Sequence, residues 1–268
     1  MYSLPDFISR VVPMVEHTLD PKHREAAWLA CRSYFYDHRA QVHDPAVKEQ
    51  MCLHLANYLA TFGMYRNSFL MQYNHRIHEE AVEYLCRQDN VYWNYDPFFP
   101  NGNPFCPPLP VDFFCAGVSA LAGTLADCYA KYNGGNPPTD TLISKILLGT
   151  LGCVPAYDDR VKKALADLGL PQNYTQSGVQ ALVDDVNRDP DLVAYIRGLC
   201  AHYAPYLTPM RVVDMALWND PAAASGTSEA ENSAPEAEMT LAPTQANGFI
   251  PGTWVQQGGA VLWQKKQD

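Results

Sequence analysis

The ionisable residues best able to do chemistry together are Lys145 and the group Asp158, Asp159 and Arg160, which follows it by 13 to 15 residues. Lys145 lies inside an apolar run, Leu142 to Leu151, that predicts a helix buried on most sides. An amine without water favours its uncharged form, which is a nucleophile or a general base, and a nearby carboxylate can stabilise a cation or activate water. The other interpretation is a buried ion pair that fixes two helices, with Asp158 or Asp159 as N-cap and Arg160 at the surface.

The elements that must position these residues are two consecutive helices. Gly152 and Pro155 end the apolar helix, and the segment from 157 to 160 begins a second helix that runs to about Leu168. Gly169 follows as its C-cap. The sequence therefore predicts a helical hairpin with the lysine on one arm and the carboxylates at the start of the other.

Three segments carry a resemblance to known proteins. HLANYLATFGMYRNSFLMQ, TDTLISKILLGTLGCVPAYDDRV and TPMRVVDMALW resemble motifs of a family of uncharacterised bacterial helical proteins, across residues 52–218. More distantly, residues 139–170 resemble the catalytic region of the helix-hairpin-helix DNA glycosylases, and Lys145 then matches their Schiff-base lysine and Asp158 their essential aspartate. The pair Arg160-Val161 matches the family's His-Val pair. This resemblance implies an all-α domain that flips out and excises a nucleic-acid base.

The chain departs from that family in front of the lysine. GGNPPTDTLIS stands where the family has its hairpin glycines, and Asp140 in the first helical turn would repel a DNA phosphate. Two functions therefore remain open. One is a degenerate glycosylase-like domain that binds or processes a base, and the other is a non-enzymatic module that binds a protein partner through the aromatic residues of 92–106 or the C-terminal segment.

The net charge and the cysteine content limit which partners and which cellular compartment the sequence predicts. The 268 residues contain 19 Lys and Arg against 29 Asp and Glu, a net charge of −10, which argues against tight non-specific binding of nucleic acid. The eight cysteines are scattered, which predicts reduced thiols in the core of a cytoplasmic protein. No export signal is recognisable, and we count no run of the ~18 apolar residues that span a bilayer.

Two further groups of side chains have residue types that can bind a ligand. His75 and His78, three apart on a helix predicted from about His75 to Arg87, can present two imidazoles to a metal, but no third ligand has an obvious spacing. We therefore predict no metal and no cofactor. Tyr65 and Arg66 follow the break at Gly63, where such a pair can bind an anion or stack on a base, or simply bond the last carbonyls of the preceding helix.

The last predicted helix carries Asp214 and Trp218, four residues apart, which we expect in a polar network against the core. The overall expectation is one compact all-α domain of nine or ten helices over residues 1–218. Six prolines exclude regular structure from residues 92–110. The small, acidic stretch 219–244 predicts a disordered linker. Residues 245–268 predict a C-terminal docking segment, which is either a small hairpin docked on the domain or an anchor for a partner.

Overall fold

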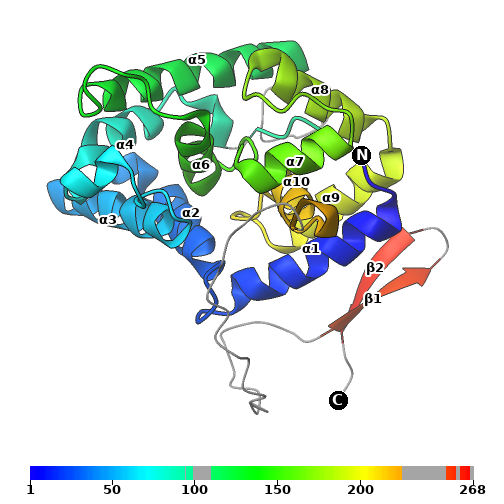
Figure 1. Cartoon of the computed structure of the whole chain (residues 1–268). Coiled ribbons are helices and arrows are strands. Elements are labelled where there is room, and N and C mark those ends of the chain that lie inside the picture. Colours follow the sequence, from blue (N-terminus) through cyan, green and yellow to red (C-terminus); the bar gives the residue numbers. More distant parts are fainter. Residues whose placement is uncertain (94, 99–109, 225–251, 258–259, 266–268) are drawn as a thin grey trace. The chain divides into compact units, whose positions relative to one another are not determined.

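The computed structural model describes residues 1–93, 95–98, 110–224, 252–257 and 260–265. The chain divides into two compact units, Met1–Thr227 and Ser228–Asp268. The first unit is an all-α domain, as expected from the sequence (Figure 1). The second contains an antiparallel hairpin of β1 (Gly252–Gln257) and β2 (Ala260–Lys265), in which Trp254 pairs with Trp263.

The described part of the first unit contains eleven α-helices. Their bounds are α1 Leu4–Leu19, α2 Ala26–His38, α3 Pro45–Thr61, α4 Glu79–Leu85, α5 Val111–Ala130, α6 Asp140–Thr150, α7 Asp159–Asp167, α8 Gln176–Asn187, α9 Pro190–His202, α10 Pro209–Trp218 and α11 Pro221–Ala224. Short 3-10 turns lie at Arg39–Gln41, Phe69–Gln72, His75–His78 and Val91–Trp93.

Local sequence explains where most of these helices begin. Side-chain oxygens of Asp44, Thr139, Asp158 and Thr208 accept hydrogen bonds from the first free backbone N–H groups of α3, α6, α7 and α10. α1 continues through Pro13. The helix predicted from about His75 is shorter than expected, because residues 75–78 form a 3-10 turn before α4.

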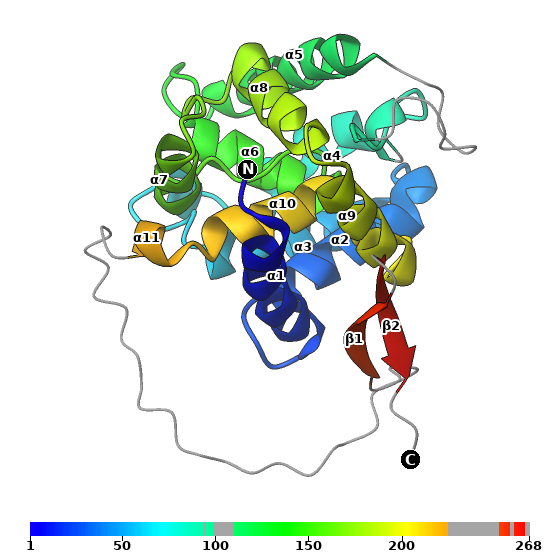
Figure 2. The same cartoon turned by 90° about the vertical axis from the view of Figure 1, so that its right-hand side faces the viewer.

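α6 lies in the middle of the domain, with α5 on one side and α2, α3 and α10 on the other (Figures 1 and 2). Every residue from Leu142 to Thr150 is buried. The packing is close: a Cβ on Gly149 would lie 2.3 Å from Tyr58 Cε1, so only glycine lets α3 approach here. Gly152, with φ +64°, then ends the helix in the left-handed conformation.

The proline-rich segment is anchored where the structure describes it. Trp93, Tyr95 and Phe98 are at most 8% exposed. The buried guanidinium of Arg32 donates to the Trp93 carbonyl and, at 2.7 Å, to that of Thr150. These aromatic side chains belong to the core and do not offer a protein-binding surface; residues 99–109 lie outside the described residues.

The structure describes residues 219–224 of the segment that the sequence assigns to a linker. Asp220 is buried, accepts a hydrogen bond from the Tyr2 hydroxyl at 2.6 Å and forms an ion pair with Arg10 at 2.9 Å, and α11 follows it. These two long-range contacts tie Asp220 to the N-terminal part of the chain, which composition alone could not indicate. The rest of the predicted linker, residues 225–244, lies outside the described residues, and the hairpin expected in residues 245–268 is present as β1 and β2.

α5 bears on the expectation that no segment spans a membrane. α5 is long and apolar enough, by length and composition, to cross a membrane, although a count of uninterrupted apolar residues had found no such segment. Core helices of water-soluble proteins meet the same criterion, and α5 buries eight side chains in this domain.

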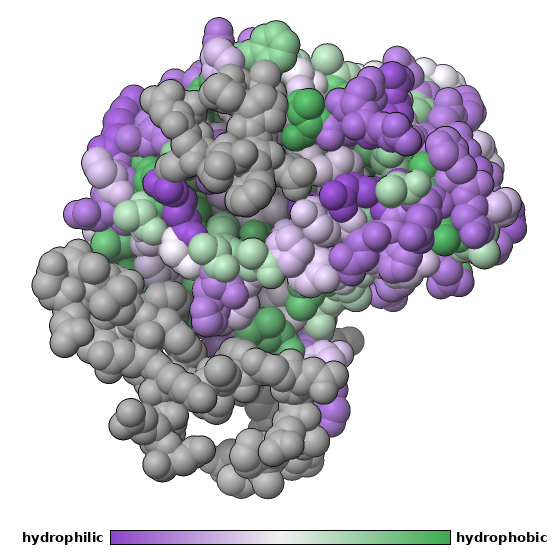
Figure 3. Space-filling view, turned by 180° about the vertical axis from the view of Figure 1, so that it is seen from behind, coloured by the Kyte–Doolittle hydropathy of each residue, from purple (hydrophilic) through white to green (hydrophobic). Residues whose placement is uncertain are grey.

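Seen from behind, much of the surface is hydrophilic, with small hydrophobic areas between (Figure 3).

Candidate functional site

The turn between α6 and α7 brings Asp158 back to Lys145. Ser144 Oγ accepts a hydrogen bond from the Tyr157 amide at 2.9 Å, and Thr141 Oγ1 donates to the Tyr157 carbonyl at 2.8 Å. These two hydroxyls, one and four residues before the lysine, tie the turn to the side of α6. The helical hairpin predicted from the sequence is thus closed by side chains of its own first arm.

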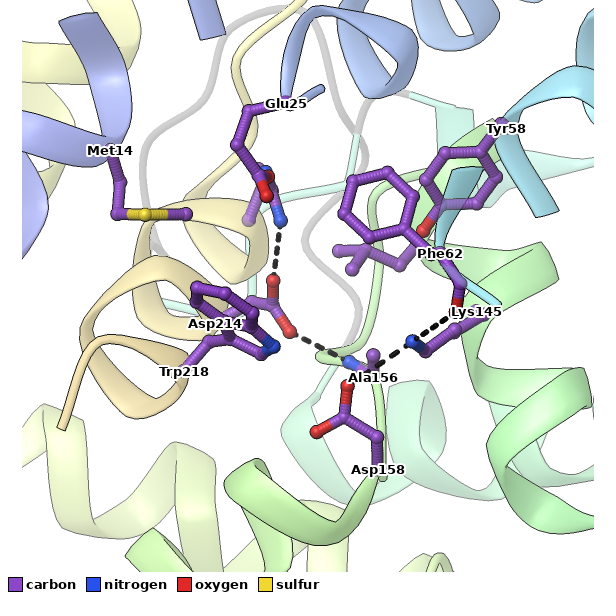
Figure 4. Close-up of a pocket in the computed structure, with 11 residues that line it drawn as sticks. Met14, Glu25, Tyr58, Phe62, Lys145, Ala156, Asp158, Asp214 and Trp218 are labelled. Atoms are coloured by element: carbon purple, nitrogen blue, oxygen red, sulfur yellow. Dashed lines mark hydrogen bonds and ion pairs between the residues drawn. The ribbon is translucent and has the colours of Figure 1, made fainter. Parts of the chain in front are cut away.

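Lys145 and Asp158 form an ion pair at the centre of this hairpin (Figure 4). Lys145 Nζ lies 3.2 Å from Asp158 Oδ2 and 3.3 Å from the Phe62 carbonyl, which caps the C-terminal end of α3. Asp158 Oδ1 meanwhile accepts from the Val161 amide at 3.1 Å. The ammonium therefore faces the negative end of one helix dipole and the carboxylate the positive end of another, so both charges are stabilised by backbone.

A second ionic group lies beside this pair and is more deeply buried. Arg211 donates to Asp214 at 2.6 Å and to Glu25 at 2.8 Å, and the three side chains are 2% to 4% exposed. Burial raises the pKa of Asp214 to about 6, although Arg211 opposes the shift. Burial also acts to lower the pKa of Arg211, but the two carboxylates outweigh it and raise that pKa above its usual range.

Asp214 connects the two groups. Its Oδ1 accepts a hydrogen bond from the Ala156 amide at 2.8 Å, two residues before Asp158. The carboxylate of α10 therefore fixes the turn that presents Asp158 to the lysine. The polar network expected around Asp214 is present, and its centre is the arginine one turn earlier.

The two ionic groups share a small cavity. Its volume is about 10 Å³, enough for about one water molecule. Tyr58, Phe62 and Trp218 contribute aromatic rings to its wall, and Met14, Leu148 and Ala156 contribute apolar atoms. Tyr58 is buried, whereas Phe62 and Trp218 are partly exposed, so the outer wall consists of the two rings that reach solvent.

Two arginines stand around that outer wall. The Arg160 guanidinium lies over the Trp218 ring at 4.3 Å, and the Arg24 guanidinium lies 5.3 Å from the Phe62 ring and 5.9 Å from that of Trp218. Arg24 is exposed and also lies 3.9 Å from Glu25. The approach to the cavity thus carries local positive charge on a chain whose net charge is −10.

The other predicted site residues, Asp159, Tyr65 and Arg66, do not line the cavity. Asp159 is exposed in the first turn of α7 and does not line the cavity. Tyr65 points elsewhere: its hydroxyl lies 3.0 Å from His78 Nε2, and His78 Nδ1 lies 2.7 Å from the Tyr129 hydroxyl. Arg66 is exposed, and its amide donates to the Gly63 carbonyl. Tyr65 and Arg66 therefore form no common site with Lys145.

The histidines also point apart. His78 is fully buried between its two tyrosines, while His75 Nε2 lies 3.3 Å from Glu49. Among the described residues, no three His, Cys, Asp or Glu side chains are placed to hold a metal ion. The seven described cysteines carry free thiols, and six of them are buried. Cys106 lies outside the described residues.

Sequence reasoning missed Glu25 and Arg211. A signal for Arg211 was present, because Arg211 and Asp214 are opposite charges three apart in an otherwise apolar helix, a spacing that places them on one face. Glu25 offered no such signal, since it meets Arg211 only through the fold, 186 residues later.

Comparisons with known proteins assign no function to this site. No protein-family model, curated protein or solved structure matches the chain.

Proposed function

We propose that this domain binds a nucleic-acid base in a DNA-glycosylase-like manner and acts on its glycosidic bond at the cavity between α6, α7 and α10. The observation that carries the proposal is the Lys145–Asp158 pair, 3.2 Å apart, beside a cavity walled by aromatic rings. A lysine next to a carboxylate is the pair that such chemistry needs, and aromatic rings are the surfaces on which flipped bases stack.

The chemistry assigns one role to each residue. The Lys145 ammonium gives a proton to Asp158 Oδ2, and the free amine attacks C1′ of the deoxyribose. The bond between C1′ and the base nitrogen breaks, and the base leaves with a proton from solvent. The nitrogen loses one proton to solvent, the C1′–O4′ bond breaks as Asp158 returns its proton to O4′, and a protonated imine forms between Lys145 and C1′. Borohydride reduces this imine to a stable amine.

Binding a base requires the cavity to widen. A space for about one water molecule does not hold a nucleobase. Phe62 and Trp218 are the partly exposed rings of the wall, so their displacement opens the cavity at the least cost in buried surface. Arg24 and Arg160 lie over these same rings, where they can meet the phosphates of an approaching strand.

Borohydride trapping tests the proposal directly. Full-length protein is incubated with duplexes that carry an oxidised purine, an alkylated purine or an abasic site, and both the covalent adduct and the released base are measured. We expect an adduct on at least one base-lesion duplex for wild type and for Lys162→Met, and none for Lys145→Met. Lys162, on α7, is the matched control because it does not line the cavity.

The contrary result is as informative. If no duplex yields an adduct or a released base, the glycosylase-like function is wrong, and the Lys145–Asp158 pair serves to join α6 to α7. The domain would then be a protein-interaction module.

A further inference from the structure

A second and larger cavity lies between α1, α2, α10 and the segment that joins α9 to α10. Its volume is about 250 Å³. Its residues include Val15, Thr18, Trp28, Leu29, Leu207 and Met215, with His202, Ala204 and Tyr206 nearer the surface. Val15, Thr18, Trp28, Leu207 and Met215 are at most 8% exposed, whereas His202 and Ala204 are exposed. The cavity is therefore a pit with a buried floor and an accessible rim.

The polar atoms of the wall are largely occupied by the protein itself. Thr18 Oγ1 donates to the Met14 carbonyl at 2.7 Å, and Trp28 Nε1 donates to the Leu148 carbonyl at 2.9 Å. The Tyr206 hydroxyl bonds the Asp37 carboxylate at 3.1 Å. A water molecule needs two to four polar partners to be stable in a cavity, and this floor offers few. Apolar atoms are the better occupants.

No Lys, Arg, Asp or Glu is among the described residues that line the pit. A charged ligand would lose its hydration without gaining a counter-charge. The volume sets the size of the occupant as well, because an apolar cavity of about 150 Å³ accepts benzene. The pit is too small for a helix of a partner protein and large enough for a two-ring molecule.

We propose that this pit is a binding site for a small uncharged apolar molecule of about two fused rings, which lies against the Trp28 ring. The site is distinct from the Lys145 cavity, although Trp28 stands between the two: the Arg211 guanidinium, which lines the Lys145 cavity, lies 4.9 Å from the same ring. The proposal does not depend on the glycosylase-like function.

Methyl-detected NMR titration of the full-length protein tests it, with indole as the probe. We expect saturable shifts for the methyl groups of Val15, Leu29, Leu207 and Met215, and none for the exposed Leu53 and Met71. Benzoate, which is charged at neutral pH, should bind at least about tenfold more weakly, because the pit offers it no cation. Benzoate that binds as tightly as indole would show that the assigned ligand class is wrong.

A matched pair of variants completes the test. Leu29→Trp fills the pit and should weaken indole binding by at least about tenfold, whereas Leu53→Trp makes the same change on an exposed position of α3 and should leave it unaltered. Equal affinities in the two folded variants would overturn the site. If Leu29→Trp does not fold, the titration of the wild-type protein decides. The proposal would be refuted if the methyl groups of the four residues show no saturable shifts, or if the shifts are spread over the surface.

Discussion

Two buried polar clusters in this domain differ in charge: one contains ionised side chains and the other contains neutral ones. The charged cluster consists of Lys145, Asp158, Arg211, Glu25 and Asp214, which pair cations with carboxylates around the small cavity. The neutral cluster consists of Tyr65, His78 and Tyr129, in which an imidazole lies between two hydroxyl groups. Burial lowers the pKa of His78 to about 3, and His75 adds to the effect.

The difference lies in the counter-charges. In the part of the chain that the structure describes, no carboxylate bonds the His78 ring, so burial acts on the imidazole unopposed and leaves it neutral at pH 7. Arg211 is equally buried, but two carboxylates hold its charge. The sequence offered both regions as candidate sites from their residue types alone. Only the charged cluster keeps ionised groups beside a cavity, which is why the proposed chemistry is placed there.

The largest expected effect is on Arg211. Arg211→Met removes the charge and leaves Glu25 and Asp214 buried without their cation, which should lower the free energy of unfolding by about 3 to 5 kcal/mol at pH 7. Denaturant melts measure the change. Arg160→Met, at a partly exposed position, is the control and should cost less than about 1 kcal/mol. Similar losses for the two variants would mean that the arginine of the charged cluster is not a structural centre.

The neutral cluster should appear in the pH dependence of stability. The folded pKa of His78, about 3, is below the unfolded value of 6.5, so the unfolded chain binds more protons between these pH values. Stability is therefore fully present above pH 6.5 and falls on acidification by up to about 1.4 kcal/mol per pH unit, or about 2 kcal/mol at pH 5. Melts of wild type and His78→Gln across this range isolate the contribution, since the variant should lack it. Parallel pH profiles would show that folding does not lower the pKa of His78.

Lys145 should matter less for stability than Arg211. In Lys145→Met, Asp158 keeps its hydrogen bond to the Val161 amide, and its side chain is 16% exposed beside a cavity that admits water. We expect a loss of about 1 to 2 kcal/mol. A loss as large as that of Arg211→Met would identify the pair as purely structural and would count against the proposed function. Lys162→Met is again the control.

The sequence predicts this domain well where the determinants are local. The determinants of the helical hairpin lie close together in the sequence: the apolar run around Lys145, the helix stop at Gly152 and the N-cap Asp158. The hairpin is present in the structure, as expected. Partners that the fold supplies were not predictable. Glu25 reaches Arg211 across 186 residues, and Tyr65 turned to His78 because the 3-10 turn at 75–78 placed that imidazole in the core.

The smallest expected effect separates two adjacent carboxylates. Asp159 is exposed in the first turn of α7, where it interacts favourably with the positive end of the helix dipole, so Asp159→Asn should cost only about 0.3 to 0.5 kcal/mol, and less in high salt. Asp158→Asn keeps an oxygen for the cap but removes the charge opposite Lys145 and the acceptor for its proton. It should cost about 1 kcal/mol or more and abolish the borohydride adduct, which Asp159→Asn should leave at its wild-type level. Urea melts and trapping on the same duplexes compare the two variants. Equal loss of adduct in both would mean that the turn as a whole, and not the carboxylate that faces Lys145, supports the reaction.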